Sequence, residues 1–483
     1  MKNMKAKTFL LALPLALGAL TGCGGKKEPV IKFWHTFGQT VVDGLKSKIA
    51  EFKKLVKEND GVDIDIDMKY QGAYDDNAKQ ISDGFSVMNT PTIAVAYPDN
   101  VADFLDIGKS ANTDFVVNLD KFIKSNDVGF GREKWLGDKY GEDDFIEDFY
   151  EEGSSYTLEG TYSLPFLKST EIMFYNMDLL VEAMKGFKPE FESSKTKIKE
   201  YMARISWDDF IDLCTYIKDN KGSISNMLEV PMWYDSDANY IITKMFQSET
   251  PYSSIEANGK GKIEFASGEA FDKVVDLLDD ARVNYANKLF YTKGIKNTYG
   301  SDFFTNEKCI FSIGSSGGSG YNFPQAEAFE LGVCRVPASN NRPIYVSQGP
   351  TLAMFNDRGL SAAENEKLQL YAWKFMKYIT NGQVNAEICI NGSEGYVPVR
   401  HSAYETNFFQ EFMEEGERYA QCYRVVVEDV NSEGGYLVSK AFKGSAALRD
   451  ECGSMLTAAL GVTNKEAIPA LVTRAINNAS LKM

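Results

Sequence analysis

A run of seven small residues has the composition of an oxygen-binding loop. The run extends from Gly314 to Gly320, directly after a predicted strand at 309–313. Backbone N–H groups and serine hydroxyls in such a loop can donate hydrogen bonds to an oxygen-rich ligand. The run lacks the lysine and spacing of a nucleotide P-loop, and no G-x-G-x-x-G opens a helix after the first predicted strand. A ligand-binding loop and a plain flexible loop therefore both stay open.

Residue patterns for catalysis are weak. The two histidines, His35 and His401, have no partner at metal-binding spacing, and no G-x-S-x-G elbow positions a nucleophilic serine. Carboxylates are abundant, as at Glu142–Asp144, and two of them facing a cleft would suffice for a glycosidase. Runs of charge are more often solvated surface. The sequence therefore predicts a protein that is not an enzyme and has no metal or cofactor, with an exported carbohydrate-active hydrolase as the alternative.

Aromatic residues make up 13% of the chain, and several stand beside predicted loops. Flat rings stack on the C–H faces of sugars. Because the rings are stiff, they lose little conformational entropy when they order a ligand. For any one of these rings, packing in the core remains the commoner role, so the prediction depends on their clustering at strand ends. The residues concerned are Trp34, Tyr74, Tyr97, Trp233, Tyr234, Tyr240 and Tyr396.

The elements that must position these residues begin with an alternation of strands and helices. This order is typical of an α/β layer with a largely parallel sheet, whose ligands bind at the carboxyl ends of the strands. The hydrophobic pattern predicts strands at 31–34, 62–68 and 91–97, with helices at 41–56 and 75–85.

A second α/β region follows the first. Residues 171–176 predict a strand, and Ser206 is expected to cap a helix that extends to about residue 217. A further strand at 345–355 is interrupted by Gly349 and Pro350. From Glu366 the chain is predicted to be mainly helical.

The N-terminus predicts export and lipid attachment. Residues 1–22 combine three lysines with an apolar run too short to span a membrane, the layout of a signal peptide. The run ends in Leu-Thr-Gly-Cys, which matches the bacterial lipobox and makes Cys23 the expected lipid acceptor. Residues 23–30 then form a short polar tether. An ordinary signal peptide cut near Gly25, with Cys23 incidental, is the alternative.

The length and the net charge of the chain indicate its domain number and exclude one class of partner. A chain of 483 residues predicts two domains. The formal charge of −16 falls to −19 once the three lysines of the signal peptide are removed, which argues against nucleic acid as a partner. The six cysteines after Cys23 are scattered, and Cys309, Cys334 and Cys389 lie in apolar runs, so buried thiols are expected, although an exported protein can also form disulfides.

Short segments in a common order resemble the family 1 extracellular solute-binding proteins of ABC importers, with the glycerol-3-phosphate and sugar-binding branch nearest. Each segment alone is too short to be specific, but together they keep a common order over about four hundred residues. They are Phe33–His35, Tyr70–Tyr74, Leu164–Phe166, Ser169–Thr170, Tyr175–Asp178, Ser206–Phe210, Cys309–Gly318, Ala372–Phe375 and Gly395–Arg400.

This resemblance implies an α/β fold of two lobes, the type II periplasmic-binding-protein fold, with the ligand in a cleft between them. The first lobe is expected at 31–160, with about 306–360 returning to it. The second is expected at 161–305, with the helical region 361–483 returning to it. The resemblance also implies a monomer that is anchored on the extracytoplasmic face of the cell membrane and delivers a sugar or glycerol-phosphate-type solute to permease subunits.

Residues matched to the family's ligand contacts supply hydroxyls, backbone N–H groups and one guanidinium, which suit a phosphate or polyhydroxy ligand. The family's carboxylate after the third strand has Asp99 as its substitute here, and Asp237 and Tyr240 stand where two tryptophans are expected. These departures leave the ligand open between an oligosaccharide and a phosphate ester. The remaining matched residues are Tyr74, Ser169, Ser315, Gly349, Tyr396 and Arg449.

Overall fold

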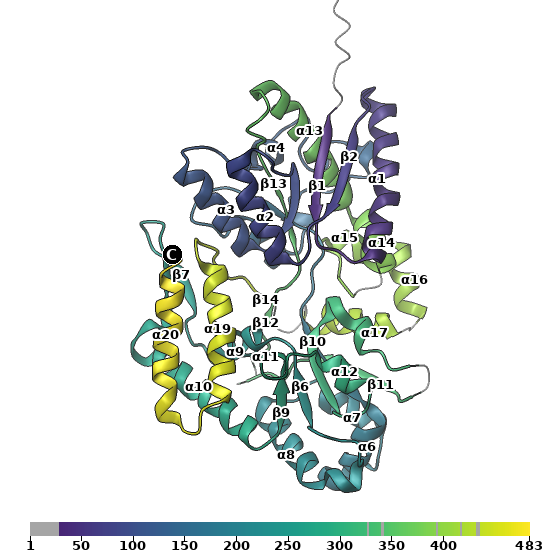
Figure 1. Cartoon of the computed structure of the whole chain (residues 1–483). Helices are drawn as coiled ribbons and strands as arrows, with labels where there is room; N and C mark the ends of the chain where they lie inside the picture. The colour runs from purple at the N-terminus through teal and green to yellow at the C-terminus, as the bar shows by residue number, and fades with distance from the viewer. Residues whose placement is uncertain (1–28, 326–327, 340–341, 393–394, 416–417, 431–434) are drawn as a thin grey trace, which may run out of the picture.

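The structure is a computed structural model that describes residues 29–483 except 326–327, 340–341, 393–394, 416–417 and 431–434. The predicted signal peptide, Cys23 and most of the tether lie outside the described residues. The described chain forms two lobes, one above the other in Figure 1, and each contains a five-stranded sheet.

The first sheet has the strand order β2-β1-β3-β13-β4. β1 pairs in parallel with β2 and β3, whereas β13 pairs antiparallel with β3 and β4. β3 and β13 are buried along their whole length, as expected for central strands covered on both faces. The strands are β1 (Val30–His35), β2 (Asp65–Tyr70), β3 (Ile93–Ala96), β4 (Ser163–Pro165) and β13 (Thr351–Met354).

Helices surround this first sheet in the upper lobe of Figure 1. Helix α1 buries an apolar stripe of residues spaced three or four apart, which packs it onto the lobe's core. The helices are α1 (Gln39–Asp60), α2 (Tyr74–Val87), α3 (Pro98–Ser110), α4 (Asp120–Ile123), α5 (Glu147–Glu151), α13 (Ala362–Ile379), α14 (Gly382–Gly392) and α15 (His401–Tyr404).

The second sheet has the order β11-β5-β10-β6-β9 and mixes parallel and antiparallel pairs. β5 lies antiparallel to both β10 and β11, and β6 lies parallel to β10 and β9. The strands are β5 (Glu171–Asn176), β6 (Met232–Tyr234), β9 (Phe290–Thr292), β10 (Phe311–Ser315) and β11 (Leu331–Arg335).

The helices of the second lobe include the predicted one with a serine cap. Ser206 accepts a hydrogen bond from the backbone N–H of Asp209 at 3.1 Å and begins α8. The helices are α6 (Met177–Phe187), α7 (Lys195–Met202), α8 (Trp207–Ile224), α9 (Asp237–Gln247), α10 (Gly268–Ala286), α11 (Lys293–Lys296), α12 (Gly300–Phe304), α17 (Arg418–Arg424), α19 (Ser445–Leu460) and α20 (Ile468–Ser480).

Short segments run between the two lobes. The small parallel pair of β12 (Tyr345–Val346) and β14 (Tyr436–Leu437) belongs to neither large sheet. Helix α16 (Asn407–Glu415) packs against α14 and α17, and α17 packs against β11 of the second sheet. In the second lobe, β7 (Ser253–Ile255) and β8 (Gly261–Ile263) form a separate hairpin.

The predicted division of the chain needs correction at three places. β10 and β11 lie within 306–360, which was expected in the first lobe, but they pair with β5 in the second sheet. β4 was expected in the second lobe and pairs with β13 in the first. Helices α13 and α14 also pack against α1 of the first lobe. Hydrophobic patterns reveal strands and helices but not their partners, so these assignments were wrong.

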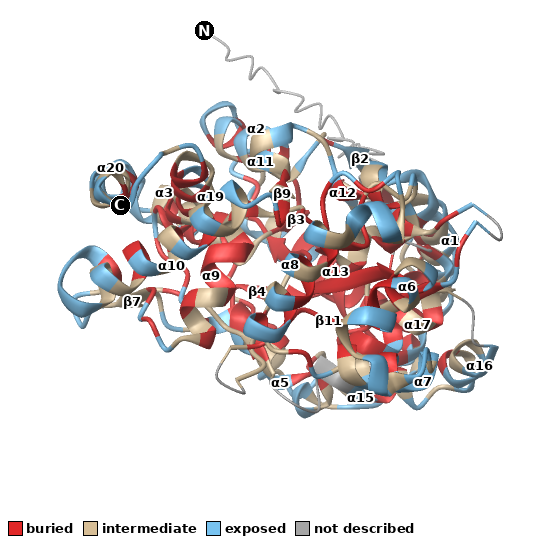
Figure 2. Cartoon of the chain, turned by 90° about the horizontal axis from the view of Figure 1, so that it is seen from below, coloured by how far each residue is buried: buried red, intermediate tan, exposed pale blue. Residues whose placement is uncertain are grey.

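Buried residues concentrate in the strands and on the inward faces of the helices, while the outer turns are exposed (Figure 2). The six cysteines among the described residues are all buried thiols, which confirms the prediction. Within the described part of the chain, no helix combines the length and apolar character needed to cross a membrane.

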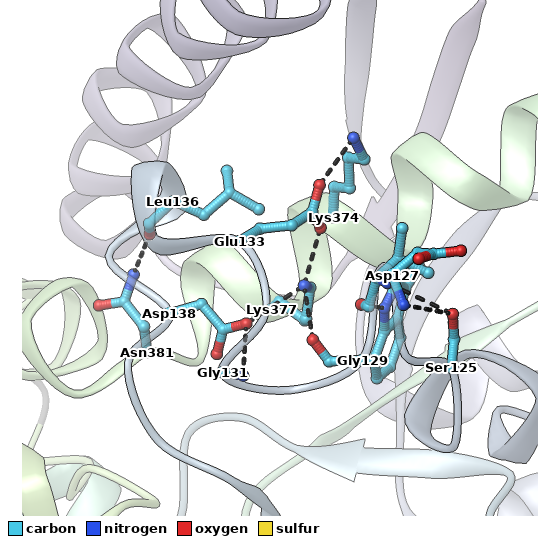
Figure 3. Close-up of polar contacts among 12 residues, drawn as sticks. Ser125, Asp127, Gly129, Gly131, Glu133, Leu136, Asp138, Lys374, Lys377 and Asn381 are labelled. Carbon is cyan, nitrogen blue, oxygen red and sulfur yellow. Dashed lines mark hydrogen bonds and ion pairs between the residues drawn. The ribbon is translucent and has the colours of Figure 1, made fainter.

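A buried ion-pair network joins helix α13 to the segment after α4 that contains Gly129, Glu133 and Asp138 (Figure 3). Lys377 has no exposed surface and donates to the Gly129 carbonyl at 3.2 Å, Glu133 at 2.8 Å and Asp138 at 3.2 Å. Lys374 pairs with the second carboxylate oxygen of Glu133 at 2.8 Å. Burial raises the pKa of Asp138, and the nearby Lys377 opposes that rise. The network therefore compensates buried charges that would otherwise destabilise the lobe.

Candidate functional site

A polar cleft of about 520 Å³ lies between the two lobes. Its walls come from loops that follow strands of both sheets, from the segments that run between the two lobes, and from the start of α19. The residues that line it are Asp75, Tyr97, Pro98, Asp99, Glu152, Ser236, Ala238, Asn239, Ile242, Tyr252, Lys293, Val346, Ser347, Gln348, Leu437, Ser439, Lys440, Ala441, Ser445, Arg449 and Asp450.

The carboxyl end of β3 supplies one wall of this cleft. The strand ends at Ala96, and α3 begins at Pro98, whose fixed φ suits the first position of a helix. Tyr97 and Asp99 are thereby held at the cleft, with the Asp99 carboxylate accepting a hydrogen bond from the N–H of Asn100 at 2.9 Å. This arrangement follows the rule that ligands of α/β sheets lie beyond the carboxyl ends of the strands.

Arg449 reaches the same wall from the opposite lobe. Its Nη2 lies 3.1 Å from the Asp99 carboxylate, and its guanidinium lies 5.0 Å from the centre of the Tyr97 ring. The side chains of Arg449 and Asp99 are 29% and 14% exposed. The structure therefore brings two of the predicted site residues together, one from each lobe.

Four further predicted residues gather beside Tyr97, outside the residues that line the 520 Å³ cleft. The rings of Tyr74 and Tyr97 are 4.5 Å apart between centres. Burial raises the pKa of Tyr74, and the neighbouring Tyr396 adds to the rise. On the other side of Tyr396, the Ser315 hydroxyl donates to the Ser169 hydroxyl at 3.3 Å. The hydroxyls of Ser169 and Ser315 are therefore joined to each other, whereas the buried Tyr74 hydroxyl has no hydrogen-bond partner among the described residues.

Tyr396 is also held close to the glycine-serine run. A Cβ on Gly317 would lie 3.0 Å from the Tyr396 ring, so a glycine allows the approach. The run is wound into helical turns at Ser316–Asn322 and capped by Ser315, which accepts from the N–H of Gly317 at 3.2 Å. In the structure it is therefore a helical segment of the second lobe rather than an irregular loop.

Gly349 occupies a position that only glycine fits comfortably. Its φ is +88°, and a Cβ there would lie 2.1 Å from the carbonyl oxygen of Leu167. The turn directs the two preceding residues, Ser347 and Gln348, into the cleft. Their Oγ and Oε1 atoms are buried and have no hydrogen-bond partner among the described residues. Buried polar atoms are normally satisfied, so each of these two atoms calls for a partner that the described residues do not supply, such as a water molecule or a polar ligand.

Sequence reasoning missed Ser347 and Gln348 as site residues. Their signal was present, because they stand directly before Gly349 and Pro350, where the predicted strand at 345–355 is broken. The structure divides that segment between β12 and β13, which belong to different sheets. Where a predicted strand is interrupted between the two lobes, its backbone and side chains can face the cleft.

Asp237 and Tyr240 do not line the cleft, which corrects the prediction. The ring of Tyr240 is 1% exposed and stacks against Phe290 in the core of the second lobe. Asp237 accepts a hydrogen bond from the Thr457 hydroxyl and so ties α9 to α19. The helical period explains the difference, since Asn239, on a neighbouring face of α9, is the residue that reaches the cleft.

A neutral carboxyl lies beneath Asn239. Burial raises the pKa of Glu171 to about 8, although hydrogen bonds from Tyr234 at 2.5 Å and Asn239 at 3.3 Å oppose the rise. At neutral pH this group is therefore mostly protonated. It fixes the orientation of the Asn239 amide without adding a full charge under the cleft.

The charges that line the cleft are largely matched on the protein itself. Arg449 pairs with Asp99, and Glu152 pairs with the buried Lys168 at 2.5 Å. Lys293 donates to the hydroxyl of Tyr299, an interaction of 2.6 Å. The lining holds one more carboxylate than cations. Among the described residues, no group of three or more metal-ligating side chains is positioned to hold an ion.

Two α/β lobes with a polar cleft between them define the class of two-lobed binding proteins. The fold is similar to the GacH receptor of Streptomyces glaucescens, with a TM-score of 0.64 and 15% identity over 94% of this chain and 98% of that one. The bacterial extracellular solute-binding protein family model matches residues 49–414, and the chain belongs to this family. No curated protein sequence matches the chain.

Two further solved structures have the same fold. The cyclic alpha-maltosyl-1,6-maltose binding protein from Arthrobacter globiformis has a TM-score of 0.65 and 16% identity over 94% of this chain and 99% of that one. UgpB from Mycobacterium tuberculosis, in complex with glycerophosphocholine, has a TM-score of 0.63 and 13% identity over 93% and 97%. The predicted family and the two-lobed type II fold are confirmed, and the chain is a binding protein rather than an enzyme.

Proposed function

We propose that this chain is the lipid-anchored binding component of an ABC importer and captures a carbohydrate or glycerol-phosphate-type solute in its interlobe cleft. The observation that carries the proposal is the pair of buried, unpartnered polar atoms of Ser347 and Gln348 at the lobe crossing. Membership in an extracellular solute-binding family supports delivery to permease subunits. We further propose that the protein acts as a monomer.

The ligand contacts are proposed from residues of both lobes. Asp99 and Arg449 line the cleft, and the hydroxyls of Tyr74, Ser169, Ser315 and Tyr396 would meet a ligand that extends beyond Tyr97. Gly349 contributes through its turn, which places Ser347 and Gln348 at the cleft. The residues proposed to contact or shape the ligand site are Tyr74, Tyr97, Asp99, Ser169, Asn239, Ser315, Ser347, Gln348, Gly349, Tyr396 and Arg449.

Among the proposed ligands, a neutral carbohydrate fits the charges better than a phosphate ester. Arg449 already faces Asp99, and the lining holds an excess of carboxylate over cations. A dianionic ligand would have to enter against that excess. The similar proteins from Streptomyces glaucescens and Arthrobacter globiformis are described with acarbose and with cyclic alpha-maltosyl-1,6-maltose, which supports testing oligosaccharides first.

Intrinsic tryptophan fluorescence and calorimetry with a panel of ligands test this function. The panel contains maltooligosaccharides, mannooligosaccharides, glycerol 3-phosphate and glycerophosphocholine. We expect one-to-one binding of a neutral oligosaccharide, no release of product on long incubation, and weaker binding of the phosphate esters. Sustained turnover that disappears on replacing Glu152 or another cleft carboxylate would establish the hydrolase alternative.

The lipid anchor has its own test. Replacing Cys23 with serine removes the thiol that would be alkylated, so Cys23→Ser is expected to leave the membrane fraction or keep an uncut signal peptide. The effect should be large, because stable anchoring needs two or more acyl chains. Detergent phase partitioning of wild type and variant measures it. Unchanged partitioning of Cys23→Ser would show that another feature holds the protein at the membrane.

A further inference from the structure

Helix α3 presents a row of carboxylates on one face. Asp99, Asp103 and Asp106 are spaced four and three residues apart, so they lie one above the other along the helix. Like charges at this spacing repel one another unless cations or N–H groups lie opposite. Burial raises the pKa of Asp103 to about 6, and the adjacent carboxylates contribute to the rise.

The start of α19 supplies a partner for each member of the row. Besides the pair at the cleft, the backbone N–H of Gly444 donates to Asp103 at 2.9 Å. The Nζ of Lys443 lies 3.0 Å from Asp106, with side-chain exposures of 50% and 29%. Gly444 is the residue that caps α19, so the positive end of the helix dipole also faces the row.

These three contacts join different lobes. Helix α3 follows β3 of the first sheet, whereas α19 packs against α9, α10 and α20 of the second lobe. Figure 1 shows the upper end of α19 beside α3 at the edge of the molecule. Asp103, Asp106 and Lys443 are not among the residues that line the cleft. Substitutions at these three positions therefore leave the residues that line the cleft unchanged.

We propose that the carboxylate row of α3 and the start of α19 form an electrostatic latch that holds the lobes together without ligand. A separation of the lobes at this edge would break all three contacts, so the latch raises the fraction of molecules in the arrangement described here, which we take as the binding-competent one. Apparent affinity scales with that fraction. The inference rests on the proposed function only in taking the cleft as the ligand site, and the latch itself operates in the ligand-free protein.

Pulsed electron spin resonance between the lobes tests the latch without any ligand. Spin labels are attached at Val87→Cys on α2 and Val283→Cys on α10, which are 72% and 40% exposed, in a full-length chain carrying Cys23→Ser. The six buried thiols leave these as the accessible label sites. We expect a dominant short distance in the parent. Asp103→Asn with Asp106→Asn should raise the longer-distance population by about two- to fivefold, as should 1 M salt.

Charge reversal separates the latch from a general loss of structure. Lys443→Glu should open the lobes, and adding Asp106→Lys should restore the parent distance. Lys465→Gln, which breaks the exposed pair with Asp276 at 2.5 Å within the second lobe, is the matched control and should change nothing. Melting curves check folding. Identical distance distributions in the parent, the double variant and Lys443→Glu would overturn the latch, whatever the ligand screen finds.

Discussion

Lys377→Ala is expected to lower the free energy of unfolding by roughly 3–5 kcal/mol, the cost of removing one partner from a buried ion pair. Lys377 is fully buried, and its ammonium contacts two carboxylates and one carbonyl oxygen. Without it, Glu133 and Asp138 remain in the interior with fewer compensating donors. Denaturant unfolding followed by circular dichroism measures the change through the midpoint and the slope.

Two variants separate the charge effect from packing. Lys377→Met keeps most of the side-chain volume but leaves the same carboxylates uncompensated, so it should be nearly as destabilising as alanine. Lys465→Ala removes an exposed cation paired with Asp276 and should leave the unfolding midpoint almost unchanged. If Lys377→Ala unfolds within ~1 kcal/mol of wild type, the network contributes no net stability.

Arg449→Ala is expected to weaken binding of the neutral oligosaccharide found in the screen by about 30-fold, or ~2 kcal/mol. The guanidinium lines the cleft, and its removal leaves Asp99 without its partner from the other lobe. The side chain is 29% exposed, so the effect should fall at the low end for charged hydrogen bonds. Calorimetry on wild type and variant gives the difference, with a melting curve to confirm folding.

Asp99→Asn complements this experiment. It releases Arg449 from its carboxylate partner while keeping the shape of the wall, so binding of glycerol 3-phosphate should improve relative to the neutral oligosaccharide. Unchanged selectivity in Asp99→Asn would mean that the ion pair does not set the preference for neutral ligands. Equal affinities of wild type and Arg449→Ala would place Arg449 outside the ligand's contacts.

Much of the secondary structure could be predicted because it depends on local patterns. The strand at 171–176 was predicted at its observed bounds, and the cap at Ser206 was identified from a serine followed by an acidic residue. Strand pairing could not be predicted in the same way. β10 pairs with β5 across more than a hundred intervening residues, and nothing local in either strand specifies that partner.

Candidate site residues could be identified from the sequence where the backbone conformation or a close approach allows only one residue type. The structure holds Gly349 at positive φ and the Tyr396 ring against Gly317, and their contact with a ligand stays a prediction. Tyr240 was misassigned because a tyrosine suits both a sugar and a core, and only the rotation of α9 distinguishes them. Gln348 was overlooked because its importance comes from lacking a partner, which a sequence does not display.

The interleaving of the two lobes has a consequence for how the chain reaches its native state. α19 and α20 complete the packing around α9 and α10, and α13 and α14 complete the packing around α1. An emerging chain therefore lacks part of the first lobe's core until α14 is available, and part of the second lobe's core until the helices beyond residue 440 are available. A truncation before α19 should therefore leave aggregation-prone surfaces on the second lobe.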